Sequence, residues 1–152
     1  MPFSLTAIYK NVLEVVPHIQ STKSKNSFLT TDNLCNLKTI KNIESALALF
    51  QEAAAKQAEA TEQGDYKTGN KCYDEIMSVL NFLRQNNSIQ SLYAFLSAPS
   101  VGVRLWAASL LLPTHEKESI RVLKEIKKME GVHSLTAETT ISEWRKGNLK
   151  FH

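Results

Sequence analysis

The sequence predicts an all-α fold built from short antiparallel helix pairs. Apolar residues recur every three or four positions in one segment after another, which is the spacing of a buried helix face. No segment shows the strict alternation of apolar and polar residues that is typical of a half-buried strand. The chain holds only 5 glycines among 152 residues, and short polar turns separate the helical segments. This pattern is typical of a helical-repeat superhelix or a compact bundle.

The chain divides into an N-terminal segment, residues 1–40, and a main domain, residues 41–152. Apolar positions within residues 4–16 predict a first helix, which Pro17 ends because proline cannot continue the backbone hydrogen bonds. Residues 20–33 are rich in Ser, Thr and Asn and predict a linker. A chain of this length buries about 70% of its unfolded surface, so it needs no disulfide or metal for stability.

Two long helices are expected to open the main domain. A stripe of apolar residues predicts a helix over residues 42–62, and Gly64 suits the left-handed backbone that ends such a helix. Asp65 is expected to cap the next helix, residues 66–85, because its carboxylate accepts hydrogen bonds from free backbone N–H groups of the first turn. The expected inner faces are Ile43, Leu47, Phe50, Ala54 and Ala58 in one helix, and Tyr66, Cys72, Tyr73, Ile76, Met77, Leu80 and Leu83 in the other.

A nearly continuous apolar helix is predicted at the centre of the domain. Ser88 is expected to cap a short helix that ends before Pro99, and Ser100 is expected to cap the helix over residues 101–112. This second helix carries apolar side chains on all sides and one arginine, Arg104, in its middle. Such a helix is either buried all round or exposes part of its surface to a partner.

Two further helices complete the prediction. Thr114 is expected to cap a helix over residues 115–130. The last helix is expected to start at Ser134 or Thr136 and to end at Arg145. Its inner face is expected to consist of Ala137, Thr140, Ile141 and Trp144.

Composition and motifs argue against several classes of function. The net charge of +3 is small for a dedicated nucleic-acid binder. Cys35 and Cys72 lack CxxC spacing and predict two reduced thiols. The N-terminus does not resemble a signal peptide, and no apolar run approaches the roughly 18 residues of a membrane span. We therefore expect a cytoplasmic protein without a membrane partner.

The sequence shows no catalytic constellation. The four histidines stand singly, without the spacing of metal ligands. No phosphate-binding glycine loop, zinc-protease motif or nucleophile elbow occurs. Glu138 and Glu143 lie on one predicted helix but point in different directions, so they are not a positioned acid–base pair. We expect no enzyme activity, no metal and no cofactor.

The segment LYAFLSAPSVGVRLWAASLLL resembles a HEAT-type repeat, in which a helix and a proline-containing turn precede a Val-Arg-x-x-Ala-Ala helix. Val103, Arg104, Ala107 and Ala108 match that second helix. The resemblance implies that Arg104 is structural. In HEAT-like proteins this arginine bonds carbonyls or an acidic group along the stacked helices, and the two alanines allow the helices to approach closely.

More of the chain, about residues 44–149, resembles one small bacterial family. The segments QEAAAKQAEATEQGDYKTGNKCYDEIMSVLNFLR, VRLWAA and AETTISEWRKG are similar to a HEAT-like helical-repeat family of unknown function. Some members of that family look like immunity proteins of polymorphic or contact-dependent toxin systems. The resemblance implies a HEAT-like α-α superhelix and a protein that neutralises a cognate toxin domain, for example a nuclease, by occlusion.

The partner-binding surface is expected on the second helices of the pairs, which line the concave side of HEAT-like solenoids. Trp106 would be an aromatic anchor with a charged rim around it. The expected contacts are Trp106, Glu138, Ser142, Glu143 and Arg145. A rival surface is the acidic side of the first helix pair, around Glu62, Asp65 and Asp74.

A second hypothesis is a nucleic-acid-binding helical repeat, and a third is a general protein-interaction scaffold. Lys117, Arg121, Lys124 and Lys128 recur on one predicted helix face and could contact phosphates or an acidic protein. Acidic neighbours such as Glu118 and Glu125 dilute this positive charge, which makes nucleic acid the less favoured partner.

Overall fold

The structure is a computed structural model, and it describes residues 39–149. Within this range the chain forms helices and no strand, which confirms the all-α prediction. The helix expected over residues 4–16, the linker and Cys35 lie outside the described residues. The elements are α3 (Ile43–Gln63), α4 (Tyr66–Gln85), the 3₁₀ helix η2 (Ile89–Ser97), α5 (Val101–Leu111), α6 (Glu116–Lys127) and α7 (Val132–Arg145).

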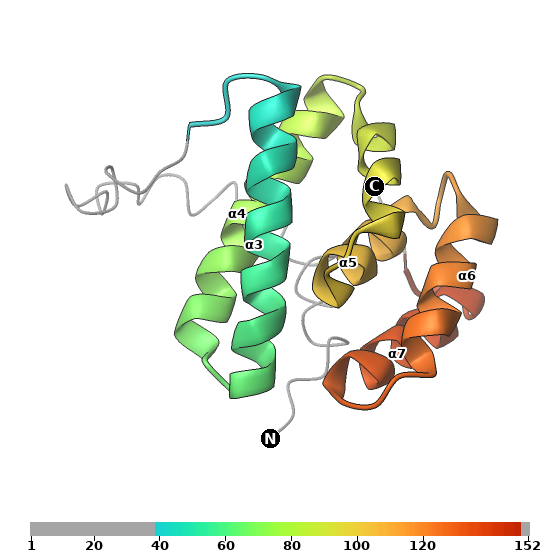
Figure 1. Ribbon diagram of the computed structural model, residues 1–152. Helices are drawn as coiled ribbons and strands as arrows, with labels where there is room; N and C mark the ends of the chain where they lie inside the picture. The colour runs from blue at the N-terminus through green and yellow to red at the C-terminus, as the bar shows by residue number, and fades with distance from the viewer. Residues whose placement is uncertain (1–38, 150–152) are drawn as a thin grey trace.

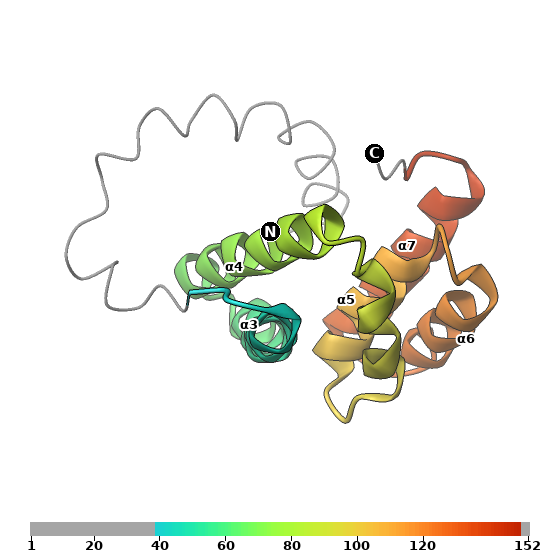
Figure 2. The ribbon, with the colours of Figure 1, turned by 90° about the horizontal axis from the view of Figure 1, so that it is seen from above.

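Helices that follow one another in the sequence pack against one another, with α5 at the centre. Figures 1 and 2 show α5 between the α3–α4 hairpin and the α6–α7 hairpin. α5 contacts η2, α3, α6 and α7, whereas α4 reaches the rest of the domain mainly through α3. None of the described helices is both long enough and apolar enough to cross a membrane.

The boundaries of the α3–α4 hairpin follow local capping rules and confirm the prediction. The Asn42 side chain accepts a hydrogen bond from the Ser45 backbone N–H at 2.8 Å and so begins α3. Gly64 ends α3 with a φ of 70°, a left-handed conformation that glycine adopts without steric cost. Asp65 Oδ1 accepts from the Thr68 N–H at 3.1 Å and begins α4.

Helix α5 is buried on all sides. Of the two predictions for its apolar sequence, burial all round is confirmed, and a surface exposed to a partner is wrong. Nine of its eleven residues are buried, so it forms the centre of the core and leaves no apolar patch of its own. Ser100 caps it as predicted, accepting from the Val103 N–H at 3.4 Å. At Gly102 an added Cβ would lie 2.3 Å from the Ala58 Cβ and 2.9 Å from the Ala54 carbonyl oxygen, so the approach of α5 to α3 depends on glycine there.

Arg104 bonds to the turn of its own helix pair. Its Nη1 donates to the Ala98 carbonyl oxygen at 3.3 Å, just before the proline turn that leads into α5. The side chain is half-buried, whereas the HEAT resemblance implied deeper burial and a bond to a neighbouring repeat. The guanidinium therefore joins η2 to α5 and does not link successive pairs.

Replacing Arg104 with alanine is expected to lower the free energy of unfolding by about 1 kcal/mol, because the Ala98 carbonyl loses its partner. Urea denaturation of the full chain measures this value. Arg104→Lys keeps a donor and a charge at the position, so it should recover part of the loss. Equal stability of the wild type and Arg104→Ala would show that the bond contributes nothing.

Ser88 occupies the N-cap position of η2 as predicted but makes no capping bond with its side chain, and the predicted cap at Thr114 is wrong. Ser88 Oγ donates to the Asn86 carbonyl at 2.9 Å, and η2 begins without a side-chain cap. At the start of α6 the capping position belongs to His115, and the preceding Thr114 hydroxyl donates to the Leu111 carbonyl at 3.4 Å.

Helix α7 begins earlier than predicted. It starts at Val132, directly after Gly131, whose φ of 104° is a backbone conformation that favours glycine. Ser134, a predicted cap, lies inside the helix, and its Oγ donates to the Lys127 carbonyl at 2.7 Å, at the end of α6. The predicted end at Arg145 is confirmed.

Candidate functional site

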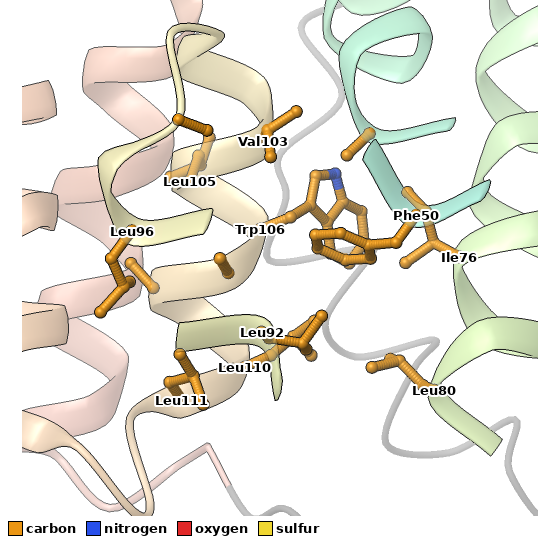
Figure 3. Packing of buried hydrophobic residues seen from close by; sticks show 14 of the residues in the cluster. Phe50, Ile76, Leu80, Leu92, Leu96, Val103, Leu105, Trp106, Leu110 and Leu111 are labelled. Atoms are coloured by element: carbon orange, nitrogen blue, oxygen red, sulfur yellow. The ribbon is translucent and has the colours of Figure 1, made fainter. Parts of the chain in front are cut away.

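Trp106 is a core residue, so the expectation of an exposed aromatic anchor at this position is wrong. Only 4% of its surface is exposed. Figure 3 shows its indole directed from α5 toward α3, where the Phe50 ring lies. The indole Nε1 donates to Gln57 Oε1 at 3.2 Å, and the Tyr73 ring of α4 lies 6.1 Å away, centroid to centroid. A buried polar aromatic with a satisfied N–H stabilises the interface between helices.

The other predicted contacts all lie on α7 or at its end, but they are not equally available. Glu138 is exposed and forms an ion pair with Lys127 at 2.7 Å, and Arg145 is exposed. Ser142 is half-buried. Glu143 accepts hydrogen bonds from Lys146 Nζ at 3.2 Å and from Asn148 Nδ2 at 2.8 Å. Its carboxylate therefore bonds to the residues that follow the last turn of α7.

The exposed side of α7 carries an apolar residue that the sequence reasoning missed. Leu135 is 63% exposed, the largest value among the exposed large hydrophobic residues of the described chain. Glu138 and Ser142 follow it at i+3 and i+7, so the three share one side of the helix. The sequence contained a signal for this exposure, because Leu135 lies outside the apolar stripe that Ala137 and Ile141 share. We call Leu135, Glu138, Ser142 and Arg145 the α7 face.

A groove opens between α3 and α4 on the rival surface. Its volume is about 120 Å³, and its lining is polar and aromatic. Gln57 and Thr61 are held by two mutual hydrogen bonds, Gln57 Nε2 to Thr61 Oγ1 at 3.2 Å and Thr61 Oγ1 to the Gln57 carbonyl at 2.8 Å. The α3–α4 groove is lined by Gln57, Thr61, Asp65, Tyr66, Gly69, Asn70 and Tyr73.

Two aromatic side chains that line or support the groove, Tyr66 and Trp106, do not lie where the sequence predicted them. Tyr66 was predicted on the inner face of its helix, but it is 53% exposed at the first position of α4. Trp106 supports the groove from the core side through Gln57 and Tyr73. Its contribution is therefore to hold the groove residues and not to contact a partner.

The α3–α4 hairpin is acidic in a chain whose net charge is positive. Hydrogen bonds from Thr68 lower the pKa of Asp65 below its usual value, so this carboxylate is ionised at neutral pH. From residue 43 to residue 85 there are seven acidic residues and four Lys or Arg, against a chain total of +3. The acidic residues are Glu44, Glu52, Glu59, Glu62, Asp65, Asp74 and Glu75.

His133 connects the first and last helix pairs beside the groove. Its Nε2 lies 2.9 Å from Glu62 Oε1, across 71 residues of sequence. A narrow crevice between α3, α5 and the start of α7 is lined by His133 and Trp106 and shares Gln57 and Thr61 with the groove. Glu62, a residue of the rival surface, therefore already has a bonding partner within the domain.

The basic residues of α6 form an exposed stripe. Lys117, Arg121, Lys124 and Lys128 are all exposed, and within residues 39–149 none of the four forms an ion pair. Glu125, at i+4 from Arg121, forms no ion pair with it. We call these four residues the α6 stripe.

The described residues offer no assembled metal site, since no three His, Cys, Asp or Glu side chains gather among them. His115 contacts the Thr114 hydroxyl and lies far in sequence from the His133–Glu62 pair. Cys72 is a buried free thiol, and burial raises its pKa, which favours the unreactive protonated form.

Comparison with known proteins adds no relative: no family model, curated protein or solved structure matches this chain.

Proposed function

We propose that this protein is a non-catalytic immunity protein of the bacterial cytoplasm that binds a cognate toxin domain and neutralises it by occlusion. In this proposal the three helix pairs, α3–α4, η2–α5 and α6–α7, correspond to HEAT-like repeats. The observation that carries the proposal is the α3–α4 groove, in which aromatic, amide and carboxylate groups meet on two rigid helices.

The chemistry of the groove suits a protein partner. Tyrosine and asparagine are frequent in binding surfaces, because tyrosine supplies a large contact area with few rotatable bonds and asparagine adapts its hydrogen bonds. The surrounding hairpin is acidic, so it complements a basic protein surface such as the substrate-binding side of a nuclease. Helices held by capping bonds present these groups on an ordered backbone, so only side chains need to be ordered upon binding.

The test uses the toxin domain that the proposal expects to be encoded next to this chain, with capture from solution and protection of growth as readouts. Two double variants each remove one large side chain and one charge: Asp65→Asn with Tyr66→Ala in the groove, and Leu135→Ala with Glu138→Gln on the α7 face. We expect the groove variant to weaken capture about thirtyfold, as loss of an interface hot spot does, and to abolish protection. The α7 variant should behave as the wild type.

The opposite pattern would move the interface to the α7 face and keep the immunity function. If no toxin gene adjoins this one and neither variant changes any interaction, the immunity proposal fails.

The α6 stripe supports the alternative proposal of a nucleic-acid-binding repeat, because four exposed cations follow one helix face. Binding of a labelled DNA duplex, followed by fluorescence anisotropy, separates the two proposals. If the stripe is only a solvated surface, binding is weak and falls steeply with salt, with a log–log slope of about −4 for four phosphate contacts. Tight binding at physiological salt would favour the nucleic-acid function.

A further inference from the structure

One side of α4 is arranged as a slot with aromatic walls. Tyr66, Gly69, Asn70 and Tyr73 stand at i, i+3, i+4 and i+7, so they share one side of the helix and all line the groove. Gly69 has no side chain between the two tyrosines, which leaves space at the middle of the row. Asp65 lies at the end of the row, where the helix begins.

Packing does not explain the glycine at position 69. A Cβ added there would meet only the Ala60 Cβ at 3.8 Å, an ordinary van der Waals distance. Gly102 is the contrasting case, because a Cβ there would overlap α3. A glycine inside a helix lowers stability relative to alanine. The core therefore does not require glycine at position 69, which lines the groove.

The lining of the α3–α4 groove carries a negative charge. Among the described residues that line the groove, Asp65 is the one that carries a charge. Its Oδ1 accepts from the Thr68 N–H at 3.1 Å. A carboxylate has about four acceptor positions on its two oxygens, so it can accept from a guanidinium as well as from the helix N-terminus. The Asn70 amide makes no hydrogen bond to another described side chain, and its carbonyl oxygen is a second acceptor on the same side of the helix.

We propose that the α3–α4 groove binds an arginine side chain of the partner protein, with the guanidinium between Tyr66 and Tyr73 and bonded to Asp65. The identity of the protein that supplies this arginine rests on the proposed function, but the recognition itself does not. A cation above a tyrosine ring is attracted by the electrons of the ring face. Arginine fits better than lysine, because its planar group stacks on aromatic rings and donates several hydrogen bonds in fixed directions.

The test is a titration of the full-length protein with N-acetylargininamide, followed by the NMR shifts of backbone amides. N-acetylcitrullinamide is the matched control ligand, because it has nearly the same shape without the charge. We expect concentration-dependent shifts at Gly69, Asn70 and Tyr73 with the arginine compound and much smaller shifts with the citrulline compound.

Three variants identify the groups that recognise the ligand. Asp65→Asn keeps the helix cap, since asparagine caps as well as aspartate, but it removes the charge and should weaken binding up to about fivefold. Its matched control is Glu59→Gln, which removes an exposed charge from the same hairpin outside the groove lining and should bind as the wild type. Tyr66→Leu should weaken binding about two- to fivefold, and Tyr66→Phe should retain it.

Gly69→Ala gives the sharpest outcome, because stability and binding should change in opposite directions. The added methyl group should raise the thermal unfolding midpoint, as alanine does inside a helix, and weaken binding of N-acetylargininamide by filling the slot. Equal affinity for the citrulline and arginine compounds, or shifts that are unchanged in both Asp65→Asn and Gly69→Ala, would overturn the proposal. Because this titration contains no toxin, its failure would leave the immunity function standing, and failed toxin capture would leave the groove assignment standing.

Discussion

Replacing Trp106 with alanine is expected to lower the free energy of unfolding by about 3–5 kcal/mol, the range for removal of a large buried aromatic side chain. Trp106 is 4% exposed and lies between α5 and α3, so its loss leaves a cavity at the centre of the domain. The Gln57 Oε1 also loses the indole N–H that it accepts at 3.2 Å. Urea denaturation followed by far-UV circular dichroism measures the change.

Trp106→Phe separates the two contributions. The phenyl ring fills most of the space but leaves Gln57 Oε1 without its donor, so we expect a loss of about 1–3 kcal/mol. Tyr93→Ala is the control for removal of an aromatic side chain at the surface, because 44% of the Tyr93 surface is exposed, against 4% for Trp106. A Trp106→Ala protein as stable as Tyr93→Ala would show that the indole does not hold α5 against α3.

Gly102→Ala is expected to destabilise the domain by about 1–3 kcal/mol, the usual cost of forcing extra atoms into a packed core. The new Cβ would lie 2.3 Å from the Ala58 Cβ, and the Ala54 carbonyl at 2.9 Å is backbone and cannot rotate away. In an unobstructed helix the same change stabilises, so Gly69→Ala is the matched control and should have the opposite sign. Thermal melts of the two variants side by side test this.

Ala58→Gly provides a second check on Gly102→Ala. The double variant removes the closest overlap but keeps the contact with the Ala54 carbonyl, so we expect partial recovery relative to Gly102→Ala alone. If Gly102→Ala stabilises as much as Gly69→Ala, the close approach of α3 and α5 is not a feature of the folded protein.

The sequence by itself determined the helices and most of their ends. The stripes of apolar residues predicted α3, α4 and α5 within a residue or two, and Gly64, Asp65 and Ser100 marked their ends correctly. Helix formation and capping depend on partners three or four residues away, so the information is local. The hydroxyls of Ser88, Thr114 and Ser134 make no capping bond, although Ser88 stands at the predicted cap position. A hydroxyl has several backbone carbonyls within reach, and local sequence does not choose among them.

Only the tertiary structure decided which side chains remain at the surface. Nothing near Trp106 in the sequence indicates Gln57, 49 residues away, yet that contact changes it from an expected anchor to a core residue. The same holds for Glu62 and His133, 71 residues apart, and for Gly102, whose requirement for glycine comes from α3. The α3–α4 groove exists because two helices meet at a particular distance and rotation. Burial depends on contacts between distant parts of the chain, and helical periodicity gives the faces of each helix but not the neighbours that cover them.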